Sequence, residues 1–437
     1  MKFRIIIKTV LPFYLLVISV SFLPFLLIVA AVVRILRFQH PQKPRFVWGS
    51  TPILNNSYWA RAMKLAGFKS ETLTSDFYRT INKRGDWDYV LSEQYPYLPY
   101  GIQEHVGFLI SMFNYDVYVI SCDGFFVGDM PLAFLQAQIL KFAKKKIVLI
   151  PYGSDAYVYR RISSSSLAHA LNISYPAASR LQTKISSRVD YWVKHADVVI
   201  PGFMFPDGLA RSDVLIPSQL MIDADMWRPS SRNNDSDGSS MAVVIAHAPN
   251  HRGFKGTEFV LDAIQQLLAE GLNVELKLLE GLQNDELRDI LSTEVDILVE
   301  QLIFCGHGLN GLEGMASGIP VVSNLEDDSY TLPFRRWSYL DECPLVSASP
   351  ETLVNTLRIL IKDADLRKNI GIASRAYVEK YHGLDSAQYL FVNIIDYLYG
   401  GGVDLSSLYH PLLSSYSLRS PKISPPLFNN KIIENRV

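Results

Sequence analysis

The sequence predicts an α/β protein in which two parallel-sheet domains follow an N-terminal membrane helix. Residues 9–33 form an apolar run without a charge, strand-like and helix-like segments alternate from residue 44, and a polar stretch at 229–240 interrupts the alternation. Alternating strands and helices are typical of doubly wound parallel sheets with helices on both faces. At 437 residues the chain is long enough for two hydrophobic cores.

Composition argues against several classes of protein. An apolar content of 49% and an aromatic content of 12% are typical of a folded chain. Because 42 Lys and Arg balance 43 Asp and Glu, we expect no nucleic-acid partner. The cysteines, Cys122, Cys305 and Cys343, are scattered and contain no C-x-x-C pair, so neither a disulfide framework nor a zinc site is expected.

The apolar run at 9–33 is long enough to cross about 30 Å of hydrocarbon. A buried core helix and a cleaved signal peptide are the alternatives, and Pro12 and Pro24 also allow a kinked or re-entrant segment. We therefore expect a membrane protein, either single-pass or monotopic. Basic residues flank both ends of the run, so the positive-inside rule alone does not set the orientation. We expect the folded domains on the cytoplasmic side.

The first domain is expected at residues 44–228. Its predicted strands lie in "RFVWG", "YDVYVISCDG", "IVLIPYG" and "ADVVIPG", and its predicted helices lie in Tyr58–Ala66 and in "LAFLQAQILKFAKKK". The polar linker at 229–240 separates it from the second domain, because this stretch contains no apolar side chain between Ser230 and Ser240.

The second domain is expected at residues 241–382. Its predicted strands lie in "MAVVIAHAP", "NVELKLLEG", "VDILVEQLIF" and "GIPVVSN". An apolar stripe predicts a helix that begins at Thr257, and Gly271 is placed to end it. A further helix is expected at 383–400, and the Ser-, Pro- and Asn-rich residues 401–437 are expected to form a loosely ordered tail.

The stretch "FCGHGLNGLEGMASGIPVVSN" has the form of a strand, a glycine loop and a helix start. Ligands of parallel sheets bind at such strand ends, where the amides at a helix N-terminus attract anions. Gly308 and Gly311 allow a ligand to approach the backbone, and Glu313 is expected to face it. The alternative is a capping box, with Asn310 as N-cap and Glu313 as the third helical residue. The two roles are compatible.

A second loop of this kind, "HAPNHRGFKGT", lies one strand–helix unit upstream. Arg252 and Lys255 place two cations beside a glycine and a helix start, which suits a diphosphate. A solvated loop with incidental charges is the alternative. Because both loops belong to one predicted sheet, we favour the diphosphate site.

The two loops together resemble the donor-binding half of family 4 retaining glycosyltransferases, which have the GT-B fold of two Rossmann-like domains facing a cleft. The resemblance implies that Arg252 and Lys255 hold the donor diphosphate and stabilise the leaving group. It also implies that Glu313 contacts the ribose and that the loop Gly308, Leu309, Asn310 and Gly311 binds the donor. It is specific only for residues 245–323.

The family's E-x7-E motif is incomplete in this chain, because Cys305 stands where its first Glu belongs. A thiol cannot accept the hydrogen bonds that a carboxylate accepts from sugar hydroxyls. Glu300 and Gln301, just upstream on the predicted strand, are candidate substitutes.

The first domain resembles the acceptor side of the same family more weakly, through "WGSTPILNNSYWARAMKLAG" and "IPYGSDAYVYRR". Asp155, in the second stretch, is a candidate residue near the reacting centre. Its alternative role is to cap the following helix. The resemblance also implies that the helix at 383–400 crosses back to the first domain.

The expected activity is the transfer of a sugar from a nucleotide-sugar donor to a glycan or lipid-linked acceptor at the membrane, with no required metal. The D-x-D triplets Asp223–Asp225 and Asp235–Asp237 are too short to predict a metal site. Two alternatives remain open. One is a nucleotide-sugar epimerase of the same fold, and the other is a non-catalytic membrane protein that binds nucleotide or glycan.

Overall fold

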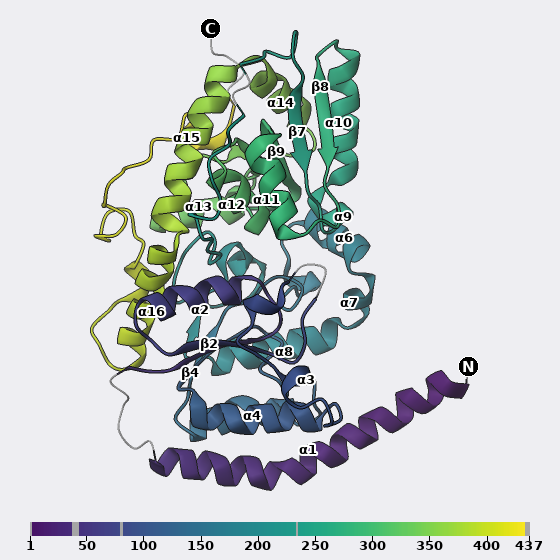
Figure 1. The fold of residues 1–437 in the computed structure, drawn as a ribbon, viewed down its shortest axis with the longest axis vertical. Helices are drawn as coiled ribbons and strands as arrows, with labels where there is room; N and C mark the ends of the chain where they lie inside the picture. The colour runs from purple at the N-terminus through teal and green to yellow at the C-terminus, as the bar shows by residue number, and fades with distance from the viewer. Residues whose placement is uncertain (1, 37–42, 79–81, 233–234, 433–437) are drawn as a thin grey trace.

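The computed structural model describes residues 2–36, 43–78, 82–232 and 235–432, which form two α/β domains and a long N-terminal helix (Figure 1). The first domain is built on a parallel sheet in the order β3-β2-β1-β4-β5-β6. Its strands are β1 (Phe46–Ser50), β2 (Ser70–Thr74), β3 (Tyr89–Val90), β4 (Val117–Ile120), β5 (Lys146–Leu149) and β6 (Val198–Val199).

Helices of this part of the chain cover both faces of the first sheet, and α1 lies below them in Figure 1. They are α1 (Lys2–Leu36), α2 (Asn55–Leu65), α3 (Leu91–Gln94), α4 (Ile102–Asn114), α5 (Gln136–Phe142), α6 (Ser165–Ser174), α7 (Pro176–Arg180) and α8 (Gln182–His195). Every residue of the central strand β4 is buried, as its continuous β-branched and aromatic run predicts.

The second domain is built on a parallel sheet in the order β11-β10-β9-β7-β8. Its strands are β7 (Val243–His247), β8 (Val274–Leu278), β9 (Ile297–Cys305), β10 (Val321–Asn324) and β11 (Val346–Ser347). Its helices are α9 (Arg252–Lys255), α10 (Thr257–Ala269), α11 (Asn284–Thr293), α12 (Leu309–Ala316), α13 (Asp328–Trp337), α14 (Leu353–Lys362) and α15 (Ala364–Tyr381). Helix α10 ends where the sequence predicts, because Gly271 takes the left-handed conformation with φ +84°.

The predicted fold class, with two doubly wound parallel-sheet domains, is therefore confirmed. In each sheet the strand order reverses once, between β1 and β4 in the first and between β7 and β9 in the second. Loops diverge at such a switch point and leave room for a ligand at the carboxyl ends of the strands. The two switch points are thus the candidate ligand sites of the two domains.

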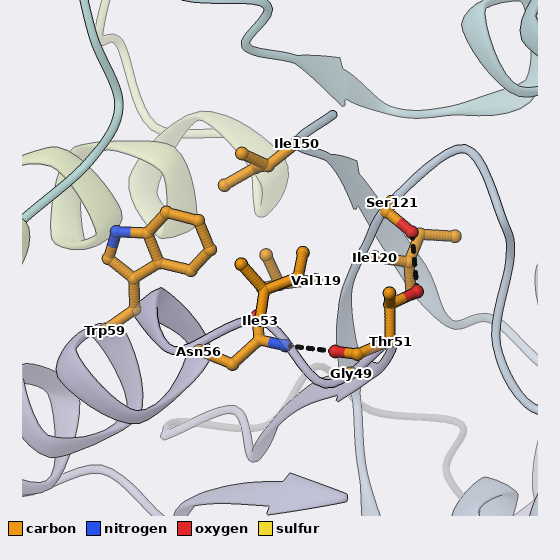
Figure 2. A pocket seen from close by; sticks show the side chains of 9 residues that line it. All are labelled: Gly49, Thr51, Ile53, Asn56, Trp59, Val119, Ile120, Ser121 and Ile150. Carbon is orange, nitrogen blue, oxygen red and sulfur yellow. Dashed lines mark hydrogen bonds between the residues drawn. The ribbon is translucent and has the colours of Figure 1, made fainter. Parts of the chain in front are cut away.

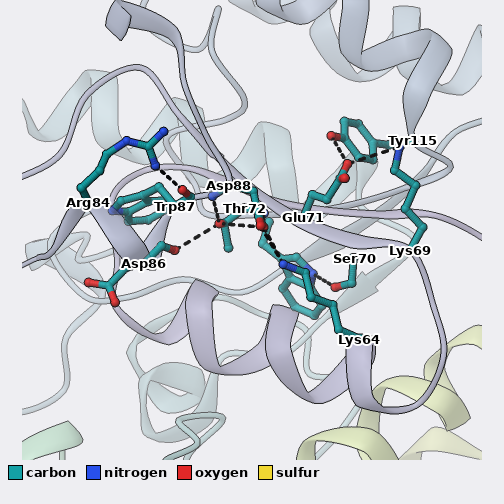
Figure 3. Close-up of polar contacts among 11 residues, drawn as sticks. Lys64, Lys69, Ser70, Glu71, Thr72, Arg84, Asp86, Trp87, Asp88 and Tyr115 are labelled. Carbon is teal, nitrogen blue, oxygen red and sulfur yellow. Dashed lines mark hydrogen bonds and ion pairs between the residues drawn. The ribbon is translucent and has the colours of Figure 1, made fainter. Parts of the chain in front are cut away.

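Polar side chains fix the short strand β3 at the edge of the first sheet (Figure 3). The Asp88 carboxylate accepts hydrogen bonds from the Thr72 amide at 2.9 Å and from Lys64 Nζ at 2.7 Å. The Thr72 hydroxyl in turn donates to the Asp86 carbonyl at 3.1 Å. These bonds join the edge of the first sheet to α2. Helix α2 also packs against α16 (Leu384–Leu398), which follows the second domain in the chain.

Helix α16 (Leu384–Leu398) follows α15 and returns to the first domain, where it lies beside α2 (Figure 1). The Phe391 ring packs edge-on against Trp48 with ring centroids 4.7 Å apart and also contacts Trp59. Gln388 Nε2 donates to the Ala62 carbonyl at 3.1 Å. This aromatic contact joins the end of the second domain to the core of the first.

The prediction of a loosely ordered tail at 401–437 is wrong for residues 401–432, and 433–437 lie outside the described residues. Tyr409 and Tyr416 are buried, and the Tyr416 ring stacks on Tyr389 at 4.0 Å. Near the end of the described chain, Asn430 Nδ2 donates to the Leu345 carbonyl at 3.0 Å. The tail lacks long helices but carries aromatic side chains, and these pack against the second domain.

Helix α1 contains a segment, Val10–Leu36, that is long and apolar enough to cross a membrane, with a mean hydropathy of 2.8. This agrees with the predicted membrane segment. The helix lies along the outside of the first domain, beneath α4 in Figure 1.

Truncation of Phe391 tests the contact between α16 and the first domain. We expect Phe391→Ala to lower the free energy of unfolding by about 3–5 kcal/mol, because the fully buried ring leaves a cavity between Trp48 and Trp59. Denaturant titration of the detergent-solubilised chain measures this loss. Val392→Ala, at the next and exposed position, is the control, with an expected change within about 0.5 kcal/mol. Equal effects of the two substitutions would show that α16 does not stabilise the first domain.

Candidate functional site

The candidate site lies at the switch point of the second sheet, where the loops after β7 and β9 come together. Lys255 is the last residue of α9, and its side chain reaches the middle of β9. Lys255 Nζ is 3.1 Å from Glu300 Oε1 and 2.8 Å from Gln301 Oε1. Both charged groups of the pair are buried, Glu300 completely. Each charge is therefore stabilised by the other and not by water.

The same two strand residues hold the glycine loop. Gly308 donates its amide to Glu300 Oε1 at 2.7 Å, and Gln301 Nε2 donates to the Gly306 carbonyl at 2.9 Å. A Cβ added at Gly311 would lie 2.2 Å from Glu300 Oε2, so only glycine allows this approach. The Glu300 carboxylate thus lies directly against the loop that begins α12, and its Oε2 has no hydrogen-bond partner among the described residues.

Glu313 is buried in the second turn of α12 and accepts a hydrogen bond from Asn284 Nδ2 at 2.7 Å. Burial raises the pKa of the Glu313 carboxyl to about 8. Burial raises the pKa of Tyr58 on α2, and the nearby Glu313 carboxylate raises it further. Glu313 therefore faces the first domain as well as the end of the second sheet.

The predicted capping box at Asn310 and Glu313 is wrong. Helix α12 begins earlier, with Gly308 as its N-cap, so Asn310 and Glu313 both lie within the helix. Asn310 Nδ2 instead donates to the Ala248 carbonyl at 3.4 Å, which links the loops after β7 and β9. The buried Asn310 Oδ1 has no partner among the described residues. The glycine at the strand end, rather than the asparagine, begins the helix.

Arg252 is placed apart from the Lys255 pair. Its guanidinium is partly exposed and contacts Glu258 at 2.9 Å and Glu280 at 3.0 Å. The structure therefore brings Arg252 and Lys255 onto one short helix, but it gives their side chains separate partners.

Asp155 lies in the first domain at the ends of β4 and β5. Its carboxylate accepts hydrogen bonds from the amides of Cys122, Tyr152 and Gly153 at 2.9–3.0 Å. Burial and the nearby charge of Asp123 raise the pKa of Asp155 to about 7. Asp155 caps no helix, which corrects that alternative. Its carboxylate oxygens join two strand ends of the first sheet.

Cys305 ends β9 outside the Lys255–Glu300 pair. Its thiol is buried, and burial together with the charge of Asp327 raises its pKa. Asp207 is a further acidic neighbour. Arg335 acts in the opposite direction and lowers the pKa of this thiol. The carboxylate that contacts the glycine loop therefore stands at Glu300, further back on the strand, and not at position 305.

Three neighbours of the site carry no sequence signal that identifies them. From the sequence, Asn284 can be recognised only as the start of a helix, and Tyr58 only as a residue within one. His247 is held in one tautomer, because Nδ1 donates to the Val299 carbonyl at 2.8 Å and Nε2 is 2.9 Å from the Thr257 hydroxyl. Burial lowers the pKa of His247 to about 4, so the ring is neutral and ties β7 to β9 and α10.

A small pocket lies at the switch point of the first sheet (Figure 2). Its polar lining comes from Thr51, Asn56 and Ser121, with the Thr51 and Ser121 hydroxyls 3.0 Å apart. Its apolar walls include Trp59 and Ile150. Asn56 Nδ2 donates to the Thr51 carbonyl at 3.0 Å, so α2 shapes the pocket from its first turn.

Comparison with known proteins identifies the fold. No family model and no curated protein matches the sequence. Sucrose-phosphate synthase from Thermosynechococcus elongatus matches with a TM-score of 0.53 and 12% sequence identity, over 82% of this chain and 99% of that chain. HepE from Anabaena, solved in complex with UDP-glucose, has a TM-score of 0.49 and 12% identity, over 80% of this chain and 99% of that chain. The chain has a GT-B glycosyltransferase fold, and at these identities the likeness concerns the fold alone.

The buried Glu313 predicts a pH-dependent stability. A carboxyl whose pKa rises from 4.5 to about 8 on folding binds protons more strongly in the folded chain, so its contribution to stability falls as pH rises through that window. We expect Glu313→Gln to remove this contribution and to flatten the pH dependence of the unfolding free energy between pH 5 and pH 8. Denaturant titrations across this range measure it. The exposed Glu351→Gln is the control, and equal pH profiles of both variants would contradict the assignment.

The surroundings of Cys305 predict the effect of restoring the motif. We expect Cys305→Glu to lower the unfolding free energy by about 3 kcal/mol or more, because it places a larger, charged side chain at a buried position where the charges of Asp327 and Asp207 oppose it. Cys305→Ser adds no charge and is expected to cost much less. Thermal unfolding of both variants measures the difference. A Cys305→Glu variant as stable as the native chain would show that this position can hold a carboxylate.

Proposed function

We propose that this chain is a membrane-attached, family 4 retaining glycosyltransferase that transfers a sugar from a nucleotide-sugar donor to a glycan or lipid-linked acceptor. One observation carries the proposal. At the switch point of the second sheet, a buried ammonium, the amides of a glycine loop at a helix start and a buried carboxylate are held close to one another. These groups suit a diphosphate and a ribose.

In this proposal, Lys255 and Arg252 hold the donor diphosphate, and the loop Gly308, Leu309, Asn310 and Gly311 surrounds it. When the donor binds, Lys255 gives up part of its contact with Glu300 and Gln301 and binds phosphate oxygens instead. An ion pair at about 4 Å and intermediate dielectric stabilises such contacts by a few kcal/mol. Glu313 accepts a hydrogen bond from a ribose hydroxyl, as it now does from Asn284.

Glu300 supplies the carboxylate that the motif lacks at Cys305. Its Oε1 already organises Lys255 and the Gly308 amide, and its Oε2 has no partner among the described residues. An unpaired buried oxygen is costly unless a ligand or water satisfies it. We assign it to a polar group of the donor.

The first domain, residues 44–228, receives the acceptor in this proposal, and the polar wall of its switch-point pocket supports that role. The reaction breaks the bond between the anomeric carbon and the diphosphate oxygen and forms a bond to an acceptor hydroxyl. It releases the nucleoside diphosphate and a proton. Lys255 and Arg252 neutralise the leaving group, so the proposal requires no metal. Asp155 keeps the strand ends beside the reacting centre in place.

The apolar helix α1 supports attachment to a membrane and therefore an acceptor found there, as in polysaccharide biosynthesis. We place the two domains on the cytoplasmic side, where nucleotide sugars are available.

A non-catalytic nucleotide-binding protein is the second candidate. It is favoured by Cys305, which lacks a carboxylate, and by Asp155, whose carboxylate is engaged by backbone amides. Binding of a nucleotide sugar without transfer or hydrolysis would identify it. Interconversion of the free donor without transfer would instead identify an epimerase.

The proposal is tested by screening nucleotide sugars for thermal stabilisation of the detergent-solubilised full chain, and then assaying transfer with the sugar that binds. A donor at about 100 times its Kd stabilises the folded chain by about 2.7 kcal/mol. We expect Lys255→Met to abolish this stabilisation and Glu300→Gln to reduce transfer at least tenfold. Lys277→Met, which removes a surface ion pair of β8, is the control and is expected to retain both. Unchanged binding and transfer in both site variants would refute the site.

A further inference from the structure

The C-terminal part of helix α1 lies against the first domain beneath α4, and its N-terminal turns extend beyond the domain (Figure 1). At one end, the Tyr14 hydroxyl donates to the Tyr100 carbonyl at 3.2 Å. At the other, Arg34 donates to the Phe142 carbonyl at 3.2 Å, and its guanidinium lies 5.1 Å from the Phe142 ring centroid. The face between these contacts is buried against α4 and α5, through Ile18, Ser19, Leu26, Ala30 and Val33.

The opposite side of the helix, which we call the outer face of α1, is apolar and exposed. Phe13 is 68% exposed and Ile28 is 60% exposed. The outer face consists of Val10, Leu11, Phe13, Leu16, Val17, Val20, Phe25, Leu27, Ile28 and Val32. The two helices that pack against α1 also expose apolar side chains, namely Ile110 and Phe113 on α4 and Phe142 on α5. A continuous exposed apolar surface of this kind marks a binding surface for a membrane or a protein.

The charges around the outer face select between these partners. The sequence contains no acidic residue before Glu71, whereas basic residues flank both ends of α1. Further lysines stand on α5 and just after it, at Lys141, Lys144 and Lys146. Basic residues beside an apolar helix face attract anionic lipid headgroups. The partner that fits is a membrane surface with anionic lipids.

The packing of α1 also decides between crossing the membrane and lying on it. If α1 crossed, its buried side would have to leave α4 and α5, or these helices would have to enter the hydrocarbon with it. Helix α4 carries Glu104 and His105, which are costly to place in hydrocarbon. An in-plane position needs neither change, because the outer face is already free to enter the lipid.

We propose that α1 binds one leaflet in the plane of the membrane, with its outer face among the acyl chains and its basic flanks at anionic headgroups. This inference rests on the membrane attachment in the proposed function and adds its geometry. The chain is then monotopic, and its N-terminus lies on the same side of the bilayer as both domains. The first-domain pocket stays at a fixed height above the leaflet.

A topology experiment tests the side on which the N-terminus lies. Full-length protein with an epitope tag at each terminus is produced in cells, and sealed membrane vesicles are treated with protease from the side that exposes the C-terminal tag. We expect both tags to be cleaved together. Protection of the N-terminal tag would overturn the inference while leaving membrane attachment standing.

A binding experiment tests the outer face. Detergent-free addition of the full chain to vesicles compares phosphatidylcholine alone with vesicles that also contain phosphatidylglycerol, and we expect stronger binding to the second. Phe13→Ser with Ile28→Gln is expected to reduce the partition coefficient by on the order of tenfold or more. Ile372→Gln, which is 63% exposed on α15, is the control and is expected to have no effect. Equal binding of all variants, or dimerisation through the outer face without lipid, would overturn the inference.

Discussion

The buried pair of Lys255 and Glu300 is the interaction on which the second-domain site depends. The two residues come from different strand–loop units, and they meet because β7 and β9 pair in a register that places His247 beside Val299. An unpaired charge at this depth costs about 3–5 kcal/mol, so the pair strongly disfavours other positions of the two loops. The glycine loop then takes its shape from Glu300, through the Gly308 amide.

The loops of this site also make contacts between the domains. The amide of Phe254, next to Lys255, donates to Ser174 Oγ of α6, in the first domain, at 2.9 Å. The Tyr175 and His251 rings lie 4.3 Å apart, and Tyr157 packs edge-on against Phe304 at 6.1 Å. A ligand that moves either loop therefore also changes how the domains meet. The short segments that form the candidate site therefore also hold the two domains together.

Sequence reasoning located the loops of the site but not the partners of their side chains. Glycine and helix-start patterns are local, so they place Lys255 and Glu313 in the segments that follow β7 and β9, where the structure has them. The N-cap predicted at Asn310 is wrong because Gly308, two residues earlier, caps the helix instead. The partners of Arg252 and the acidic surroundings of Cys305 come from other elements of the chain, and no local pattern encodes them. The periodicity of apolar residues along the chain therefore predicts the fold, whereas the side-chain contacts of the site depend on how distant segments pack together.

The folded tail has a consequence for the order in which the protein forms. Leu427 belongs to the core of the second sheet, and Asn430 binds the segment before β11. Such contacts join residues far apart in sequence and close late in folding. During synthesis α1 and the first domain leave the ribosome before the second domain, and domains generally fold as units from the N-terminus. We therefore expect the second domain to complete its core only after residues 401–432 have been made, with its apolar core open to chaperones until then.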